Sequence, residues 1–281
     1  MATILKGARA AAALDEKTLA AISGLRARGI RPGLGILRAG ERPDDLAYER
    51  GAIKRCEKIG ISVRRCALPS TAGRSELLSV IDKINHDENV HGCLMFRPLP
   101  KHIDEREICE ALELDKDVDC MTERSLAGVF TGSGRGFAPC TAQSVMELLR
   151  HYGINPARKR AVVVGRSLVI GRPVAMLLLA ANATVTVCHS RTNRLEEFTR
   201  GADIVVAALG RARALDEDYF EPGQIVIDVG INDAGDGTLV GDVDFDSVEP
   251  LVDAITPVPA GVGSVTTSVL CAHVIEAAER R

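Results

Sequence analysis

The stretch that decides the fold runs from residue 160 to residue 193 and reads RAVVVGRSLVIGRPVAMLLLAANATVTVCHSRTN. Its pattern predicts a strand, a glycine-containing turn, a helix and a second strand, at residues 161–164, 165–171, 174–181 and 184–188. Both predicted strands are rich in β-branched residues, and Pro173 stands where a helix begins and a missing N–H is tolerated. Together these elements make one βαβ unit, which predicts a parallel sheet.

The turn between Gly165 and Gly171 is suited to binding an anion, usually a phosphate. A turn that leads from a strand into a helix directs free backbone N–H groups and the positive end of the helix dipole at one point. The spacing departs from the G-x-G-x-x-G fingerprint, because Ser167 stands at the second glycine and Gly171 comes one residue late. On this pattern alone, a purely structural glycine turn is an equal alternative.

The end of the second predicted strand indicates which dinucleotide would bind. A site for NAD carries Asp or Glu about 20 residues after the glycines, to bind the ribose 2′-hydroxyl. Here residues 189–192 read HSRT, without a carboxylate, and Arg166 lies in the turn itself. Hydroxyl and guanidinium groups suit a 2′-phosphate, so the pattern favours NADP. The alternative is that Arg166 and Arg191 are solvated surface charges.

The composition excludes several classes of protein. The chain has 281 residues, 46% of them apolar, which suffices for two modest domains or one large one. A net charge of −3 and an aromatic content of 3% give no footprint for nucleic acid or a membrane surface. The eight cysteines form no C-x-x-C pair, which favours free thiols in a reducing compartment over disulfides or zinc. We therefore expect a cytoplasmic protein without a signal peptide, a membrane span or a metal site.

Strands and helices alternate along the rest of the chain. Apolar periodicity predicts further helices near residues 10–30, 45–59, 75–85, 104–112, 141–152, 195–200 and 265–280. Short apolar runs predict strands near residues 33–37, 61–68, 93–96, 204–208 and 225–229. The composition of residues 233–238 is typical of a turn. This alternation predicts an α/β protein with a mainly parallel sheet and a domain boundary near helix 141–152.

Nine short motifs then occur in an order that is typical of one family. They are PLP (98–100), DKDVD (115–119), PCT (139–141), GRSLVIGRP (165–173), NATVTVCHSRT (182–192), DIVVAALG (203–210), VIDVGIN (226–232), GDVDF (241–245) and TPVPAGVG (256–263). With them, nearly the whole chain resembles the bifunctional methylenetetrahydrofolate dehydrogenase/methenyltetrahydrofolate cyclohydrolases of one-carbon metabolism, the FolD type, whose product serves purine biosynthesis.

The resemblance implies two α/β domains that flank a cleft. Residues 1–140 would form a catalytic, folate-binding domain on which the C-terminal helix 265–281 packs, and residues 141–264 a Rossmann-type NADP-binding domain. A homodimer built largely through the nucleotide domain is implied as well. The implied NADP contacts are Gly165, Arg166, Ser167, Ser190 and Ile231. The implied folate contacts are Tyr48, Asp119, Pro257, Gly261 and Gly263, with Tyr48 and Asp119 as the catalytic-site residues that position the substrate.

The chain departs from the family at its proton-transfer groups. The family places a lysine one helical turn after its tyrosine, where this chain has Ala52, and a glutamine before P-L-P, where this chain has Phe96. Lys54 is no substitute, because at about 100° per residue it lies roughly 240° around a helix from Tyr48, against about 40° for position 52. The folate loop also changes, with Ala260 for a glycine and Ser264 for a proline.

These departures predict which reaction survives. Hydride transfer from the methylene carbon to NADP releases no proton and needs mainly the positioning of two rings. Ring opening by water needs proton transfer, which the lysine with its neighbour supplies in the family. We therefore expect an NADP-dependent methylenetetrahydrofolate dehydrogenase with weak or absent cyclohydrolase activity. The alternatives are a non-catalytic NADP-binding paralogue and a dehydrogenase for another reduced pterin.

Overall fold

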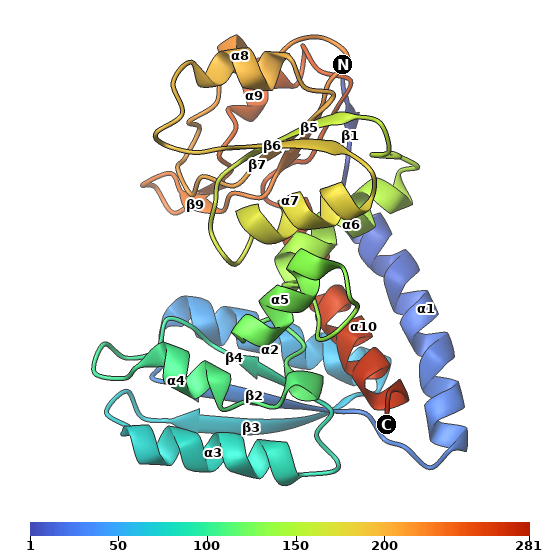
Figure 1. Ribbon diagram of the computed structural model, residues 1–281, viewed down its shortest axis with the longest axis vertical. Helices are drawn as coiled ribbons and strands as arrows, with labels where there is room; N and C mark the ends of the chain where they lie inside the picture. The colour runs from blue at the N-terminus through green and yellow to red at the C-terminus, as the bar shows by residue number, and fades with distance from the viewer. The chain divides into compact units, whose positions relative to one another are not determined.

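The computed structural model describes residues 1–281, which divide into two compact units. One unit joins Met1–Ala13 to Thr141–Thr266 and holds a six-stranded sheet, and the other joins Leu14–Cys140 to Thr267–Arg281 and holds a three-stranded sheet (Figure 1). We call them the six-stranded unit and the three-stranded unit. Each consists of helices packed on a parallel sheet, so the predicted α/β class is confirmed.

The six-stranded unit has the strand order β1-β11-β8-β7-β5-β6, with every neighbouring pair parallel. Its strands are β1 (Thr3–Ile4), β5 (Arg160–Val164), β6 (Thr184–Cys188), β7 (Ile204–Ala207), β8 (Ile225–Asp228) and β11 (Ala254–Ile255). Its other elements are α6 (Cys140–His151), α7 (Gly171–Ala180), α8 (Leu195–Arg200), α9 (Phe245–Val248), the short helices at Glu217–Tyr219 and Val262–Ser264, and the hairpin of β9 (Asn232–Asp233) and β10 (Leu239–Val240).

The strand order reverses beside β5, since the chain moves from β5 to β6 on one side and then returns to β7 on the other. In open parallel sheets, such a switch point leaves a crevice at the carboxyl ends of the two strands, and ligands bind there. The turn after β5 begins at Gly165, and the segment after β7 begins at Ala208. The topology therefore directs attention to the stretch that the sequence singled out.

The three-stranded unit has β2 (Gly33–Ala39) between β3 (Ser62–Leu68) and β4 (Gly92–Met95), all parallel. Its helices are α1 (Gly7–Ala27), α2 (Pro43–Ile59), α3 (Arg74–His86), α4 (Glu105–Glu110), α5 (Glu123–Thr131) and α10 (Thr266–Glu279), with a short helix at Leu114–Lys116. The first residues of α1 and of α10 are counted with the six-stranded unit. Apolar side chains of α3, α4 and the sheet form one core cluster, which includes Leu77, Ile81, Cys93 and Ile108.

The first thirteen residues belong to the six-stranded unit, whereas the sequence suggested a catalytic domain that begins at residue 1. The reason is β1, in which Thr3 and Ile4 pair with Ala254 and Ile255 of β11. A two-residue strand has no periodicity that a sequence pattern could reveal. Helix α5, β11 and α9 were likewise not predicted, and the predicted turn at 233–238 is the loop of the β9–β10 hairpin.

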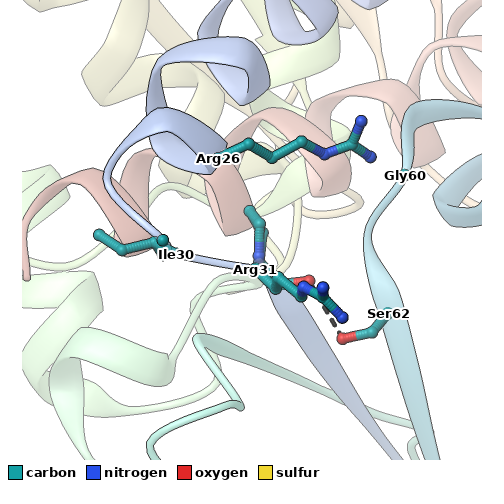
Figure 2. Close-up of a pocket in the computed structure, with 7 residues that line it drawn as sticks. Arg26, Ile30, Arg31, Gly60 and Ser62 are labelled. Atoms are coloured by element: carbon teal, nitrogen blue, oxygen red, sulfur yellow. Dashed lines mark hydrogen bonds between the residues drawn. The ribbon is translucent and has the colours of Figure 1, made fainter.

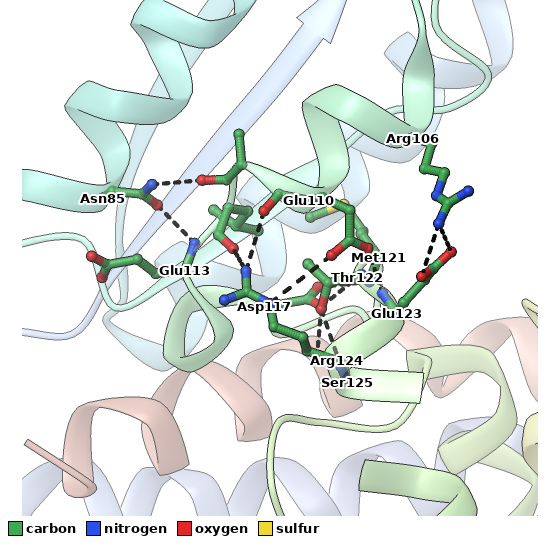
Figure 3. A network of polar contacts seen from close by, with 12 residues as sticks. Asn85, Arg106, Glu110, Glu113, Asp117, Met121, Thr122, Glu123, Arg124 and Ser125 are labelled. Atoms are coloured by element: carbon green, nitrogen blue, oxygen red, sulfur yellow. Dashed lines mark hydrogen bonds and ion pairs between the residues drawn. The ribbon is translucent and has the colours of Figure 1, made fainter. Parts of the chain in front are cut away.

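The DKDVD motif at residues 115–119 connects neighbouring segments through the hydrogen bonds of Lys116 and Asp117. The Lys116 ammonium is buried and donates to the carbonyl oxygens of Ile84, Asn85 and Asp87, which end α3. The buried Asp117 carboxylate accepts from the backbone of Met121 and from both the N–H and the hydroxyl of Thr122, as Figure 3 shows. These partners engage Lys116 and Asp117, so the two other aspartates of the motif, Asp115 and Asp119, lie outside this network.

Candidate functional site

The turn after β5 has no room for a side chain at its first residue. Gly165 has φ +139°, and a Cβ there would lie 2.1 Å from the carbonyl oxygen of Ala208, at the end of β7. The Ser167 hydroxyl accepts from the N–H groups of Ile170 and Gly171, at 3.1 and 3.4 Å, and so caps the start of α7. The turn is therefore held in a fixed shape at the switch point, and a backbone cradle that only glycine permits fits a dinucleotide phosphate.

Two neighbouring strands bring the predicted nucleotide residues to one edge of the sheet. Val164 pairs with Cys188 in register, so the Gly165 turn and Ser190 follow adjacent strand ends. The N–H of Gly165 donates to the carbonyl of Cys188 at 2.9 Å. Arg166, Ser190 and Arg191 are exposed, and neither arginine forms an ion pair. Both guanidinium groups remain able to bind a ligand.

Two buried aspartates, which the sequence reasoning did not single out, brace this edge of the sheet. The Asp242 carboxylate accepts from the N–H groups of Leu209, Gly210 and Arg211, at 2.5, 3.0 and 2.8 Å. The Asp228 carboxylate accepts from the N–H groups of Gly230, Asp242 and Val243, and so ties β8 to the GDVDF segment. The signal was present in the motifs VIDVGIN and GDVDF, whose aspartates hold the loops that follow β7 and β8.

The protonation of Asp228 depends on its burial. Burial raises its pKa to about 7, although three backbone N–H groups act in the opposite direction, and the neighbouring charge of Asp242 raises the pKa further. Transfer of a carboxylate out of water disfavours its charged form, and hydrogen bonds to the carboxylate favour that form. Here the desolvation is the larger effect. The brace therefore changes charge near neutral pH.

A cavity of about 190 Å³ in the six-stranded unit brings four predicted site residues together. Ile231, Pro257, Gly261 and Gly263 line it, together with the hairpin residue Leu239. Ile231 and Leu239 are 60% and 50% exposed, which is unusual for large apolar side chains. A small apolar cavity beside the switch point is suited to a flat ring. Ala260, at the position of a family glycine, lines the same cavity with φ +79°.

In the three-stranded unit, the site residues gather at the carboxyl end of the sheet. Tyr48 lies on α2, and its ring meets the ring of Phe96 edge to face, with centroids 5.9 Å apart and an interplanar angle of 79°. Phe96 follows β4 directly and is buried, with 9% exposure. Ala52, one turn after Tyr48, is 0% exposed, whereas Lys54 is exposed. No lysine therefore occupies the position where the family carries one, and Lys54 faces solvent.

The turn of α2 between Tyr48 and Ala52 is fixed by a buried ion-pair network that the sequence did not reveal. Glu49 is 3% exposed, and its two carboxylate oxygens accept from Arg38 Nε at 3.0 Å and Arg65 Nε at 2.8 Å. Arg38, at the end of β2, also donates to the carbonyl of Gly40. Loss of one partner in such a buried pair costs several kcal/mol, on the order of 3–5. The network holds Tyr48 at a fixed place over the sheet.

Asp119 completes this group of residues. Its Oδ1 accepts from the N–H of Cys140 at 3.0 Å, and burial raises the pKa of its carboxyl group. The positive charge of Arg97, the residue after Phe96, acts against this rise. The side chain is only half-buried by accessible surface, so it can still reach a ligand. The structure thus brings Tyr48, Phe96, Arg97 and Asp119 to one region of this unit.

A larger cavity of the three-stranded unit, of about 520 Å³, lies at the opposite edge of the sheet. It is lined by Arg26, Ile30, Arg31, Gly60 and Ser62, which Figure 2 labels. Arg26 lies in the last turn of α1, Ile30 and Arg31 precede β2, Gly60 follows α2, and Ser62 begins β3. Positive charge beside the carboxyl ends of helices stabilises their dipoles, which explains the arginines. No group of three or more metal-ligating side chains occurs in the chain.

The fold and the sites define an α/β protein that binds a dinucleotide at the switch point of its six-stranded sheet. Comparison with known families gives the same class: residues 139–281 match the tetrahydrofolate dehydrogenase/cyclohydrolase NAD(P)-binding domain, and residues 5–119 match the catalytic domain of the same family. The chain belongs to the tetrahydrofolate dehydrogenase/cyclohydrolase family, and the predicted resemblance is confirmed.

Relatives and solved structures match over the full chain. The bifunctional protein FolD of Carboxydothermus hydrogenoformans is 52% identical over 281 residues, which cover 99% of this chain and 98% of that protein. The crystal structure of the bifunctional enzyme FolD from Campylobacter jejuni superposes with a TM-score of 0.97 at 38% identity, covering 100% of both chains. FolD of Trypanosoma brucei, in complex with NADP cofactor and an inhibitor, has a TM-score of 0.93 at 34% identity and covers 99% of this chain and 98% of its own.

Proposed function

We propose that this protein is an NADP-dependent 5,10-methylenetetrahydrofolate dehydrogenase in which the cyclohydrolase activity of the family is weak or absent. The observation that carries the proposal is the contrast between two strand ends. The glycine turn after β5 keeps its cradle, whereas α2 and β4 present Ala52 and Phe96 in place of a proton-transfer pair. The first feature supports hydride transfer, and the second removes the groups that ring opening needs.

The nucleotide would be held by the edge that follows β5 and β6. The N–H groups of the turn other than those of Gly165, Ile170 and Gly171 suit the pyrophosphate, and Arg166 with Ser190 suits the 2′-phosphate. Ile231 lines the small cavity beside this edge, where an apolar wall suits the nicotinamide ring. NADP supplies a hydride acceptor when it is bound. The contribution of these residues is to fix the ring and to exclude water from its face.

Each unit carries predicted folate contacts, and we propose them for each unit by itself. Tyr48 and Asp119 belong to the three-stranded unit, and Pro257, Gly261 and Gly263 to the six-stranded unit. Tyr48 offers a ring and a hydroxyl, and Asp119 offers a carboxylate that accepts N–H groups of a pterin. The product of hydride loss is a cation that its two flanking nitrogens stabilise, so no residue needs to remove a proton. We propose the division into a folate-binding and an NADP-binding domain on the same grounds.

Water addition to the methenyl cation would proceed slowly in this protein. A positioned general base contributes roughly 10²–10⁴-fold to such a step. Arg97 cannot supply it, because a guanidinium stays protonated at physiological pH. The apolar ring of Phe96 stands where the family has a polar amide, so it would also disfavour an ordered water. The methenyl product should therefore persist after it forms.

A direct assay tests the proposal. Purified protein is given methylenetetrahydrofolate and NADP, and NADPH formation and the methenyl product are followed separately. We expect NADPH and methenyltetrahydrofolate to accumulate together, with ring opening at least about 10²-fold slower than in a bifunctional relative. Equal rates of oxidation and ring opening would refute the lost activity. If neither rate exceeds background while NADP binds, the result favours a non-catalytic NADP-binding paralogue. Turnover of only a different reduced pterin would favour a dehydrogenase for that pterin.

We further propose a homodimer that pairs through the six-stranded unit. Strand β6 is the last strand of its sheet, and α7 and α8 both pack beside it. Leu179, Val187 and Phe198 on these elements are 53%, 39% and 42% exposed. An edge strand flanked by exposed apolar side chains is typical of a surface that another chain covers. Light scattering should give twice the monomer mass, and Val187→Lys should lower the measured mass toward that of the monomer.

The cellular compartment is a separate proposal. The eight cysteines are free thiols, which suits a reducing compartment, and we propose the cytoplasm. No helix of the chain has the length and apolar character needed to cross a bilayer. A one-carbon role that serves purine biosynthesis would follow from the proposed activity.

A further inference from the structure

Arg97 holds an unusual position at the carboxyl edge of the three-stranded sheet. It follows Phe96, whose ring packs against Tyr48, and its own carbonyl accepts from Arg42 Nη2 at 2.9 Å. Arg42 is in turn fixed by both carboxylate oxygens of Asp45, at 2.8 and 2.9 Å. The backbone of Arg97 is therefore anchored to the start of α2, the helix that carries Tyr48. Arg97 thus directly follows Phe96, whose ring meets the proposed folate residue Tyr48.

The Arg97 guanidinium is half-buried and has no partner within the chain. None of its N–H groups donates a hydrogen bond, and no carboxylate oxygen lies within 4.0 Å of it. By contrast, Arg38 and Arg42, the other arginines of this edge, are both paired with carboxylates. The nitrogens of Arg97 are not among the buried polar atoms that lack a partner, so its N–H groups stay accessible and can donate to a molecule that binds at this edge.

Asp119 is a carboxylate on which the charge of Arg97 acts. The charge of Arg97 lowers the pKa of the Asp119 carboxyl group, while burial and the charge of Asp117 raise it. Cys140 donates to Asp119 from its N–H, and the thiols of Cys109 and Cys120 also feel the charge of Arg97. Glu105, the first residue of α4, accepts from the N–H of Leu99 at 2.7 Å. Arg97 and Asp119 thus act on each other without closing an ion pair.

A separated guanidinium and carboxylate match the amide-like edge of a reduced pterin. That edge carries a ring carbonyl next to an N–H and an amino group. A carboxylate accepts from the N–H groups, and a guanidinium fork donates to the carbonyl oxygen. We propose that Arg97 is a positioning residue that donates hydrogen bonds to the pterin carbonyl and so helps to select the folate substrate. This inference rests on the proposed function, because it names the part of that substrate which Arg97 binds.

The test compares Arg97→Leu, Arg97→Gln and Arg97→Lys with the wild type and with Arg50→Leu. Arg50 is an exposed arginine on α2 without a hydrogen bond or an ion pair, so its variant is a matched loss of one surface charge. We expect Arg97→Leu to raise the KM for methylenetetrahydrofolate about 10- to 100-fold. The kcat and the KM for NADP should stay within about threefold, because a charge-assisted contact to the substrate ring acts on binding. Arg97→Lys should recover part of the loss.

Two further readouts separate positioning from a merely structural role. Without the Arg97 charge the pKa of Asp119 rises, so the acidic limb of the kcat/KM profile should move to higher pH in Arg97→Leu and Arg97→Gln. The substrate analogue methylenetetrahydropteroate, which lacks the glutamate, should suffer the same penalty as the full folate. A penalty confined to the full folate would show that Arg97 binds the glutamate carboxylates, and it would overturn the assignment to the ring.

The outcome also separates this inference from the proposed function. If the wild type oxidises methylenetetrahydrofolate and all three Arg97 variants keep its KM within twofold, only the inference fails. If the wild type does not oxidise the substrate, calorimetry of methylenetetrahydrofolate binding to the same variants still measures the contribution of Arg97. Should Arg97→Leu unfold at a lower temperature than Arg50→Leu, the comparison uses Arg97→Gln and Arg97→Lys, which keep a polar side chain. Unchanged affinity in these two overturns the proposal.

Discussion

The carboxyl ends of β5 and β4 are followed by very different residues. The turn after β5 and the segment after β4 both lie at the carboxyl edge of a parallel sheet, where α/β proteins bind ligands. The first keeps the glycine, the capping serine and the exposed arginine that suit a dinucleotide. The second carries Phe96 and Arg97, and helix α2 presents Ala52 one turn after Tyr48. If the proposed function holds, the comparison teaches that nucleotide binding and proton transfer rest on separate residues.

The largest expected effect concerns the altered strand end. We predict that Ala52→Lys combined with Phe96→Gln raises ring opening of methenyltetrahydrofolate by about 10²-fold, part of the roughly 10²–10⁴-fold that a positioned base supplies. Ala52→Lys alone should gain much less. Position 52 is 0% exposed, so a lone lysine there would have to enter a packed site without the polar neighbour that Phe96→Gln supplies. The rate of methenyl disappearance in single and double variants measures the gain.

Phe96→Gln alone serves as the control for that comparison. It restores the polar amide without the base, so ring opening should stay near the wild-type rate while oxidation continues. A large gain from Phe96→Gln alone would mean that water access, and not the missing lysine, limits the reaction. The two strand ends would then differ in their access to water.

The second effect concerns the brace of the intact strand end. The pKa of Asp228 is raised to about 7, above the ordinary value near 4, so the folded state keeps this proton while the unfolded state releases it. We therefore predict that Asp228 makes the free energy of unfolding fall as pH rises from about 4 to about 7. The fall is at most about 4 kcal/mol, and it levels off above pH 7.

Asp228→Asn isolates this contribution, because asparagine does not titrate. Any constant cost of the substitution cancels when the difference in unfolding free energy between wild type and variant is plotted against pH. Denaturant unfolding at pH 4, 5.5, 7 and 8.5 supplies the points. A difference that stays flat across this range would show that the three backbone N–H groups keep Asp228 ionised, so that burial does not control its charge.

The third effect tests the intact turn itself. We predict that Arg166→Ala raises the KM for NADP about 10- to 100-fold and leaves the KM for NAD nearly unchanged. The reason is a charge-assisted bond to the 2′-phosphate, worth about 1.5–3 kcal/mol. Arg158→Ala, another positive residue of this unit, is the control and should change neither constant. Equal losses for both cofactors would place Arg166 on the pyrophosphate.

The smallest effect lies in the altered folate loop. Ala260 has φ +79°, a left-handed conformation that costs alanine about 1 kcal/mol relative to glycine. Ala260→Gly should therefore raise the free energy of unfolding by up to about 1 kcal/mol, while the carbonyl of residue 260 still accepts from Gly7. Ala20→Gly, on the exposed face of α1, should lower it by about 0.5–1 kcal/mol. If Ala260→Gly and Ala20→Gly lower the free energy of unfolding by similar amounts, the loop has relaxed around Ala260.

Long periodic elements were readable from the sequence, and short or irregular ones were not. The strands at 161–164 and 184–188, the glycine turn and the helix between them appear where the pattern predicted them. Their apolar periods are set by local backbone geometry, which a window of residues reveals. Strand β1 and helix α5 were missed, because a two-residue strand exists only through its partner β11, and the buried residues of α5 are Ser125 and Gly128, which no apolar pattern marks.

The sequence by itself determined the α/β class, the family and the absence of a lysine at position 52, since each of these is a matter of residue order. Only the tertiary structure decided what surrounds the altered positions. It placed the Phe96 ring against Tyr48, left the half-buried Arg97 guanidinium without a partner, and buried Asp228 beside Asp242. Burial, partners and pKa shifts arise when residues far apart in the chain exclude water together, and no local pattern records that.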